Sequence, residues 1–208
     1  MHLRTSALAL TAVIGMVSTV WAEAQTLPPG VFAAERDIAL ATAGSYTLDD
    51  SHTAVIARVS HLGYSHSIFR FDRAQGTLAW DPAAMEKAKL VVSVETASIT
   101  SNVKGFAEEL AGEKFLKAKE FPQAAFVSTA FKPVDKMRGK VEGQFTLMGK
   151  TKPVTFDVVL VGAGKGFGGK PRIGVTAVAT INPQDFSLPP FFTDPIQIVV
   201  DTEFEKQS

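Results

Sequence analysis

The sequence of 208 residues contains no cysteine, which excludes disulfide bonds and thiolate chemistry. It also has no excess charge, because 21 basic residues balance 21 acidic ones. Binding to nucleic acid or to anionic lipid through charge needs a basic excess. The composition therefore predicts no nucleic-acid partner and no polybasic membrane anchor. Only two Trp and two Tyr accompany 15 Phe, so a core built from these residues would be apolar and poor in hydrogen-bond donors.

The one long apolar run, Ala7–Val20, lies near the start of the chain. It follows Arg4 and precedes Ala22-Glu23-Ala24, the pattern of a secretory signal peptide with its cleavage site. A run of this length is shorter than the ~20 residues that span a bilayer. We expect residues 1–24 to be a cleaved signal peptide, and the exported product to have no stable membrane insertion. No cysteine follows the site, so no lipid anchor is expected. Residues 25–45 read as an N-terminal arm with a helical turn near Ala33–Ala41.

Alternation of apolar and polar residues dominates the rest of the chain, most clearly in Gly139–Gly162. Successive side chains of a strand point to opposite faces, so this stretch predicts a β-hairpin whose loop covers Met148–Pro153. The other predicted strands share the same alternation: His52–Leu62, Ile68–Trp80 with a bend at Gly76, Leu90–Ile99, Ala124–Val134, Arg172–Ile181 and Ile196–Phe204. The pattern predicts an all-β fold, an antiparallel barrel of about eight strands that closes to avoid exposed edges.

Two stretches depart from the strand pattern. Asp81-Pro82 is a typical helix start and predicts a short helix to about Ala88. Asn102–Lys119 has apolar residues at helical spacing among Glu and Lys, which indicates a short helical insertion. We expect this insertion to cover an edge or an opening of the barrel.

A barrel of this size encloses either packed side chains or one ligand, and the sequence leaves both open. The candidate ligand-binding residues share the inward face of their strands, with two more from the helical insertion. They are Phe69, Phe71, Val94, Phe106, Leu110, Phe145, Phe156, Val158 and Ile198.

Ordered motifs over Tyr46–Phe204 resemble the YceI-like family. They include Tyr46–His52 (YTLDDSH), His61–Ser65 (HLGYS), Lys119–Phe126 (KEFPQAAF) and Gly143–Val154 (GQFTLMGKTKPV). Phe69–Gly76 (FRFDRAQG), Ser93–Ile99 (SVETASI) and Ile181–Leu188 (INPQDFSL) complete the set. The chain departs from the family in two places. Phe106–Leu110 replaces the usual Arg-Asp-x-His-Leu, and Asn182–Phe186 replaces Asn-Arg-x-Asp-Phe.

The resemblance implies a periplasmic, lipocalin-like barrel over residues 46–206 that binds a polyisoprenoid lipid without enzymatic activity. It implies no cofactor. A bound apolar lipid or isoprenoid quinone is compatible with this interpretation, and so is a homodimer. Two alternatives remain. One is a structural or stress-related protein with a filled core, and the other is an enzyme acting on a small apolar substrate.

The residues give little support to other chemistry. His52 and His61 lie nine positions apart, which places them on opposite faces of a regular strand, and neither has a carboxylate at a usual ligand spacing. We therefore expect no metal site, and we predict that His52 and His61 hydrogen-bond backbone groups or carboxylates such as Asp49 at the barrel end. Glu108-Glu109 would diverge on a helix, Gly162–Gly169 lacks a phosphate-binding signature, and no Gly-x-Ser-x-Gly motif is present.

Overall fold

Ten β-strands account for most of residues 34–208, the part of the chain that this computed structural model describes. The predicted signal peptide and the arm up to residue 33 lie outside the described residues. The strands are β1 (Gly44–His61), β2 (Ser65–Phe71), β3 (Ala74–Trp80), β4 (Lys89–Glu95), β5 (Ile99–Thr100), β6 (Gln123–Pro133), β7 (Arg138–Leu147), β8 (Lys150–Lys165), β9 (Pro171–Ile181) and β10 (Ile196–Lys206).

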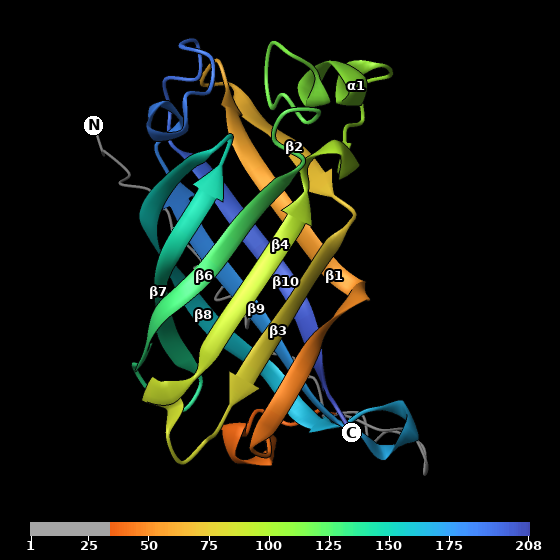
Figure 1. Cartoon of the computed structure of the whole chain (residues 1–208), viewed down its shortest axis with the longest axis vertical. Coiled ribbons are helices and arrows are strands. Elements are labelled where there is room, and N and C mark those ends of the chain that lie inside the picture. Colours follow the sequence, from red (N-terminus) through yellow and green to blue (C-terminus); the bar gives the residue numbers. More distant parts are fainter. Residues whose placement is uncertain (1–33) are drawn as a thin grey trace, which may run out of the picture. The chain divides into compact units, whose positions relative to one another are not determined.

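The sheet closes on itself. Its strand order is β10-β9-β8-β7-β6-β4-β3-β1-β2-β5, and β10 also pairs with β1. The ring therefore holds eight antiparallel strands, while β2 and β5 continue from β1 outside it. Figure 1 shows the strands wound around the barrel. The prediction of an all-β, closed antiparallel barrel of about eight strands with a short helix is confirmed.

Strand β1 is longer than predicted because it changes partner along its length. Residues 44–47 pair with β3, and residues 55–61 pair with β2. The register against β10 shifts between Asp49 and Ala54, so the chain bulges there before pairing resumes. A bulge of this kind bends a strand and redirects its side chains. Here it takes residues 50–53, His52 among them, out of the ladder, next to Asp49, which still pairs with Glu203.

The predicted strand Ile68–Trp80 is wrong, because the chain breaks at Asp72-Arg73 into β2 and β3. The backbone N–H groups of both residues donate to Ser98, one to its carbonyl and the other to its hydroxyl, at 3.2 Å each. Gly76 forms no bulge and pairs in regular register with Val92. A Cβ at Gly76 would lie 2.8 Å from the Val91 carbonyl, so the glycine is needed for close strand approach.

The predicted loop Met148–Pro153 is also wrong. Leu147 pairs with Lys150, leaving Met148 and Gly149, both with positive φ, as a two-residue turn. This is the type I′ arrangement that suits the twist of a hairpin. Pro153 lies within β8, where it pairs with Gln144 on β7, whereas β9 joins the other edge of β8 only from Asp157 onward. The proline is tolerated because that part of β8 is an edge.

Helical structure in the described residues is short. The predicted helix at Asp81-Pro82 is only the 3₁₀ turn η2 (Met85–Lys87), since the Asp81 carboxylate accepts from the Ala83 N–H at 2.9 Å and closes a local turn first. The insertion forms α1 (Phe106–Ala111), which ends at Gly112. Further 3₁₀ turns are η1 (Ile38–Leu40), η3 (Thr96–Ser98), η4 (Phe167–Gly169) and η5 (Pro183–Phe186). No described helix has the length and apolar character needed to cross a membrane.

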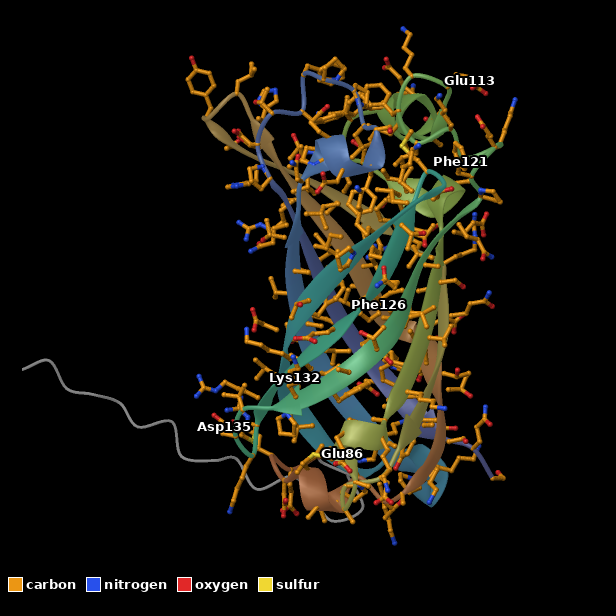
Figure 2. The ribbon with its side chains drawn as sticks, turned by 60° about the vertical axis from the view of Figure 1, so that its left-hand side comes forward. Glu86, Glu113, Phe121, Phe126, Lys132 and Asp135 are labelled. Atoms are coloured by element: carbon orange, nitrogen blue, oxygen red, sulfur yellow. The ribbon has the colours of Figure 1, made fainter. Side chains whose placement is uncertain are left out.

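The barrel has two distinct ends (Figure 1). The α1 end carries α1, the β1–β2 turn, η5 and the β9–β10 loop, and the opposite end carries the β6–β7 turn with η1 and η2. In Figure 2, Glu113 and Phe121 mark the α1 end, Lys132, Asp135 and Glu86 mark the β6–β7 turn end, and Phe126 lies between them. The helical insertion thus lies over one opening of the barrel, as its residue pattern predicts.

Candidate functional site

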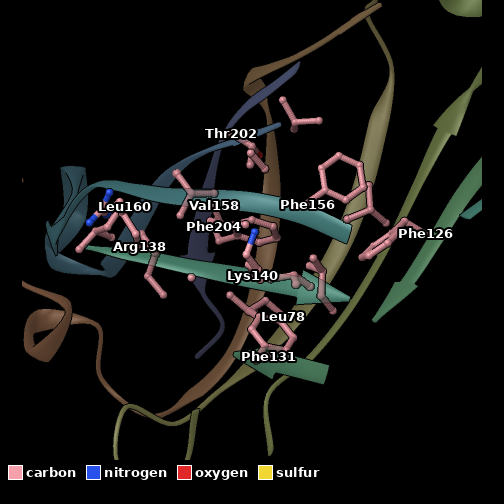
Figure 3. Close-up of a pocket in the computed structure, with 18 of the residues that line it drawn as sticks. Leu78, Phe126, Phe131, Arg138, Lys140, Phe156, Val158, Leu160, Thr202 and Phe204 are labelled. Atoms are coloured by element: carbon pink, nitrogen blue, oxygen red, sulfur yellow. The ribbon is translucent and has the colours of Figure 1, made fainter. Parts of the chain in front are cut away.

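The inner faces of all eight ring strands enclose a cavity of about 570 Å³. Its wall is almost entirely aliphatic and aromatic (Figure 3). Because side chains alternate along each strand, every second residue faces inward, and each strand contributes a short apolar row. The rows include Leu48, Leu78, Val92, Phe126, Val141, Phe156, Val158, Leu160, Val175, Ala177, Val200 and Phe204.

Charged side chains line the cavity only where it reaches the β6–β7 turn. Among the described residues they are Lys132, Asp135, Lys136, Arg138 and Lys140. Arg138 pairs with Asp135 at 2.7 Å, Lys132 with Glu142, and Lys140 with Asp157. The deeper hydroxyl of Thr202 is bonded to that of Thr53 at 2.7 Å. The cavity is therefore apolar along most of its length, with charged groups at the β6–β7 turn end.

Two phenylalanines cross the middle of the cavity wall. The rings of Phe126 and Phe156 meet edge to face, with centroids 5.0 Å apart (Figure 3). Gly143 on β7 leaves the room for this pair, because a Cβ there would lie 2.4 Å from the Phe126 ring. The glycine thus allows an aromatic pair where a larger residue would force the ring aside.

A second cavity of about 120 Å³ lies toward the α1 end. It shares Val55, Val94, Ala124, Phe145 and Ile198 with the main cavity, so the two are adjoining parts of one apolar interior. At the α1 end its wall is completed by residues from outside the ring: Leu110, Phe115, Leu116, Leu188 and Phe192. These residues close the barrel on that side.

Eight of the nine predicted ligand-binding residues line this interior. Phe156 and Val158 line the main cavity, and Phe69, Phe71 and Leu110 line the second. The three that line both are Val94, Phe145 and Ile198. Phe106 lines neither; its ring lies 6.0 Å from that of Phe69 and 6.2 Å from that of Phe115, behind the wall.

Several lining residues escaped prediction although the same alternation marks them. They line the main cavity, which extends to the β6–β7 turn, and include Leu78, Phe126, Val175 and Phe204. Phe115 and Phe192 were missed because they lie in loops, where the alternation of a strand does not apply.

A charged cluster lies beside the bulge of β1, outside the cavity. Arg172 Nη1 donates to Asp49 Oδ2 and Glu203 Oε2 at 2.6 Å each, and Nη2 donates to Glu205 at 2.8 Å. His52 Nδ1 lies 2.9 Å from Asp49, as predicted. Burial works to raise the pKa of Asp49, but its hydrogen bonds with His52 and Arg172 outweigh burial and hold that pKa below its usual value.

This cluster corrects the expectation that no carboxylate meets a histidine at ligand spacing. Asp49, His52 and Glu203 bring their ligand atoms within 4.8 Å of one another. Glu203 arrives from β10, so the sequence spacing of the histidines could not reveal it. The guanidinium of Arg172 already lies between the two carboxylates, however, and supplies the positive charge that a metal would bring.

We expect thermal unfolding to be the same with and without EDTA, and metal analysis to find no stoichiometric zinc. A structural zinc adds folding free energy directly, so its removal would lower the melting temperature. A fall of several degrees on chelation, reversed by added zinc, would show that the Asp49 cluster holds a metal.

Replacing Arg172 with Met should lower the free energy of unfolding by about 2 kcal/mol at pH 7, because its carboxylate partners lose their shared donor. Hydrogen bonds from Lys170 and Arg172 also hold the pKa of Glu205 below its usual value. Carboxylates with a lowered folded-state pKa stabilise the fold above their unfolded pKa of about 4 and lose this effect as the pH falls through the folded value. The difference between the two proteins should therefore shrink below about pH 4. Urea unfolding across pH would show it, and a constant difference would contradict this role.

The cavities give no support to the alternative of enzymatic acid–base chemistry, because the described His–carboxylate pair, Asp49 and His52, does not line them. Glu108 and Glu109 are exposed on α1, away from the cavity side marked by buried Leu110. His61 and His66 are exposed near the β1–β2 turn. The predicted hydrogen bond of the His61 side chain is not found among the described residues. The site is thus defined by an enclosed apolar volume.

Fold and site together define a class: closed antiparallel barrels of eight strands with an apolar interior and one helical insertion. A family model described as the YceI-like domain matches residues 46–204, and the chain belongs to that family. A UPF0312 protein of Pseudomonas putida (strain W619) is 39% identical over 150 residues, which cover 71% of this chain and 78% of that protein. The resemblance drawn from the ordered motifs is confirmed.

Solved structures share the fold. A YceI protein of Campylobacter jejuni matches with a TM-score of 0.65 at 26% identity, covering 72% of this chain and 91% of that one. BcnA of Burkholderia cenocepacia matches at 0.67 and 24% identity, covering 75% and 98%. A polyisoprenoid-binding domain from Saccharophagus degradans matches at 0.58 and 14% identity, covering 78% and 98%, a likeness of fold alone.

Proposed function

We propose that this protein is an exported, non-enzymatic binding protein that holds a long apolar lipid of the polyisoprenoid type inside its barrel. The observation that supports this most is the apolar interior, whose main cavity measures about 570 Å³ and whose charged lining residues, among those described, lie at the β6–β7 turn end. Ligand-binding pockets fall in the range of roughly 300–1,000 Å³. The name of the Saccharophagus degradans relative, a polyisoprenoid-binding domain, points to the same class of ligand.

The energetics favour carriage over tight storage. Burying one five-carbon isoprene unit from water is favourable by roughly 4 kcal/mol, at ~0.8 kcal/mol for each carbon group. A lipid in a bilayer is already out of water, so the barrel gains little by removing it from there. An apolar cavity within a protein that is itself in water suits carrying or sequestering such a lipid across an aqueous space. Because the sequence of residues 1–24 has the pattern of a signal peptide, we propose that the protein acts in the periplasm.

The proposal is tested by titrating lipid-free protein with a fluorescent polyprenol. We expect saturable binding to one site, with competition by unlabelled long polyprenols and far weaker competition by a single-isoprene alcohol. Longer chains compete better because each added carbon group buries more apolar surface. Equal competition by short and long alcohols would contradict a binding site for long isoprenoids.

A further inference from the structure

The β1–β2 turn has an exposed apolar residue, Leu62, at a position whose backbone conformation disfavours leucine. His61 pairs with Ser65, and the Tyr64 N–H donates to the His61 carbonyl at 3.0 Å. Leu62 and Gly63 form the centre of the turn, with φ of 54° and 76°. Asn-Gly is the usual choice at these two positions, because residues other than Gly, Asn and Asp are strained at positive φ. Leu62 is nevertheless 81% exposed.

The β7–β8 turn provides an internal comparison. Met148 and Gly149 also have positive φ, at 48° and 70°. Met148, however, is buried and packs in the same core cluster as Leu147 and Phe186, so burial offsets the strain of its backbone. Leu62 has no comparable burial against the described residues. A contact outside the folded monomer would account for an apolar residue at this turn.

The α1 end gathers most of the strongly exposed large apolar residues. Tyr64 is 89% exposed beside Leu62, and Phe191 in the β9–β10 loop is 65% exposed. Val103 is exposed just before α1. These residues sit on three separate loops at one end of the barrel (Figure 1). Exposed apolar side chains gathered at one end of a protein can mark an interaction site.

The hairpin has no acidic residue between Arg58 and Arg70 that would oppose an anionic surface. From Arg58 to Arg70 it contains two arginines and two histidines. Arg58 contacts the amide oxygen of Gln197, and Arg70 contacts Asp72 just outside this range. Tyr64 adds a ring with a polar tip, a residue type enriched where lipid meets water.

The exposed residues also connect to the cavity. The Phe191 ring lies 5.9 Å from that of Phe115 and 4.6 Å from that of Phe192. Phe115 and Phe192 line the second cavity. A chain of aromatic rings thus joins the exposed tip of the β9–β10 loop to the apolar interior.

We propose that the α1 end docks on the surface of a lipid bilayer, with Leu62 and Tyr64 entering the head-group region and the aromatic chain through Phe191 marking the route between membrane and cavity. This inference rests on the proposed function, because it supplies the place where a lipid would be exchanged. The outer edge of β2 pairs with β5 only at Arg70 and Phe71, so pairing with a second copy is the competing explanation for this hairpin.

The test uses the full mature protein and sedimentation with vesicles of phosphatidylethanolamine and phosphatidylglycerol. Combining Leu62→Asn with Tyr64→Ser should reduce the vesicle-bound fraction about tenfold. The matched control is Val161→Ser, which removes a 54% exposed apolar side chain of β8 that lines neither cavity and should leave binding unchanged. Leu62→Asn alone should keep or raise the melting temperature, because Asn suits the turn. The melting temperature of the double variant shows whether a fall in its vesicle binding comes from unfolding.

Three outcomes would overturn the docking proposal. They are no vesicle binding by the wild type, equal binding by the double variant, and a wild-type dimer in size-exclusion chromatography that the double variant loses, since that would make the hairpin an interface between copies. Measuring the lipid extracted from the wild type and from the double variant distinguishes failure of the docking proposal from failure of the proposed function. Retained lipid in a wild-type protein that binds no vesicles overturns docking alone, and absent lipid with intact vesicle binding overturns carriage alone.

Discussion

Replacing Phe186 with Ala should lower the free energy of unfolding by about 4 kcal/mol, the cost typical of removing a fully buried phenylalanine. Phe186 is only 1% exposed, and its ring meets that of Phe145 at 5.3 Å. The 3₁₀ turn η5 presents it to the core, and Asn182 caps that turn by accepting from the Gln184 N–H at 3.1 Å. For a domain of this size the melting temperature should fall by roughly 10 °C.

The same segment offers a matched control in Phe191. It has the same side chain but is 65% exposed, so Phe191→Ala should change the free energy of unfolding by no more than about 0.5 kcal/mol. Calorimetry on both variants checks the contrast. Similar shifts for the two would mean that Phe186 does not seal the α1 end as its packing indicates.

Replacing Ala177 with Trp should reduce retained lipid at least tenfold and leave the barrel intact. Ala177 lines the main cavity between its cross-strand partners Val158 and Val200, which also face inward. An indole there takes volume that a lipid chain would otherwise fill, and each displaced carbon group removes up to ~0.8 kcal/mol of burial. Because the indole fills empty space in the cavity, the free energy of unfolding should stay the same or rise by about 1 kcal/mol.

The control for this substitution is Thr180→Trp on the same strand. Thr180 is exposed and pairs with Gln197, so the added ring lies in solvent. Lipid content should match the wild type. Loss of lipid in the Thr180 variant, or normal lipid in the Ala177 variant, would show that the ligand does not occupy the main cavity.

Alternation predicted which residues face inward, since a strand has only two faces and its apolar one meets the core. Phe145, Phe156 and Val158 were found in this way on β7 and β8. The remaining wall residues depend on how the segments at the α1 end close the barrel. Leu110 lines the second cavity although it belongs to α1, while Phe106, four residues earlier, lies behind the wall. Residue pattern cannot separate these two, because both lie on the apolar face of one short helix.

Turns were the weakest point of prediction because their geometry depends on partners distant in sequence. The break at Asp72-Arg73 carries no glycine or proline and exists because Ser98 accepts both N–H groups. Pro153 suggested a loop, yet it occupies a stretch of β8 that β9 does not reach. The charged cluster around Arg172 was hidden for the same reason, since β1, β9 and β10 meet only in the closed barrel.

The most direct test of lipid carriage is mass spectrometry of the organic extract from mature protein purified without detergent from a bacterial host. The account predicts an isoprenoid lipid in near-stoichiometric amount in the wild type and its loss in Ala177→Trp, whose fold remains intact by circular dichroism. A correctly folded wild-type protein that yields no lipid, and takes none up from vesicles, would contradict carriage and favour a structural role for the barrel.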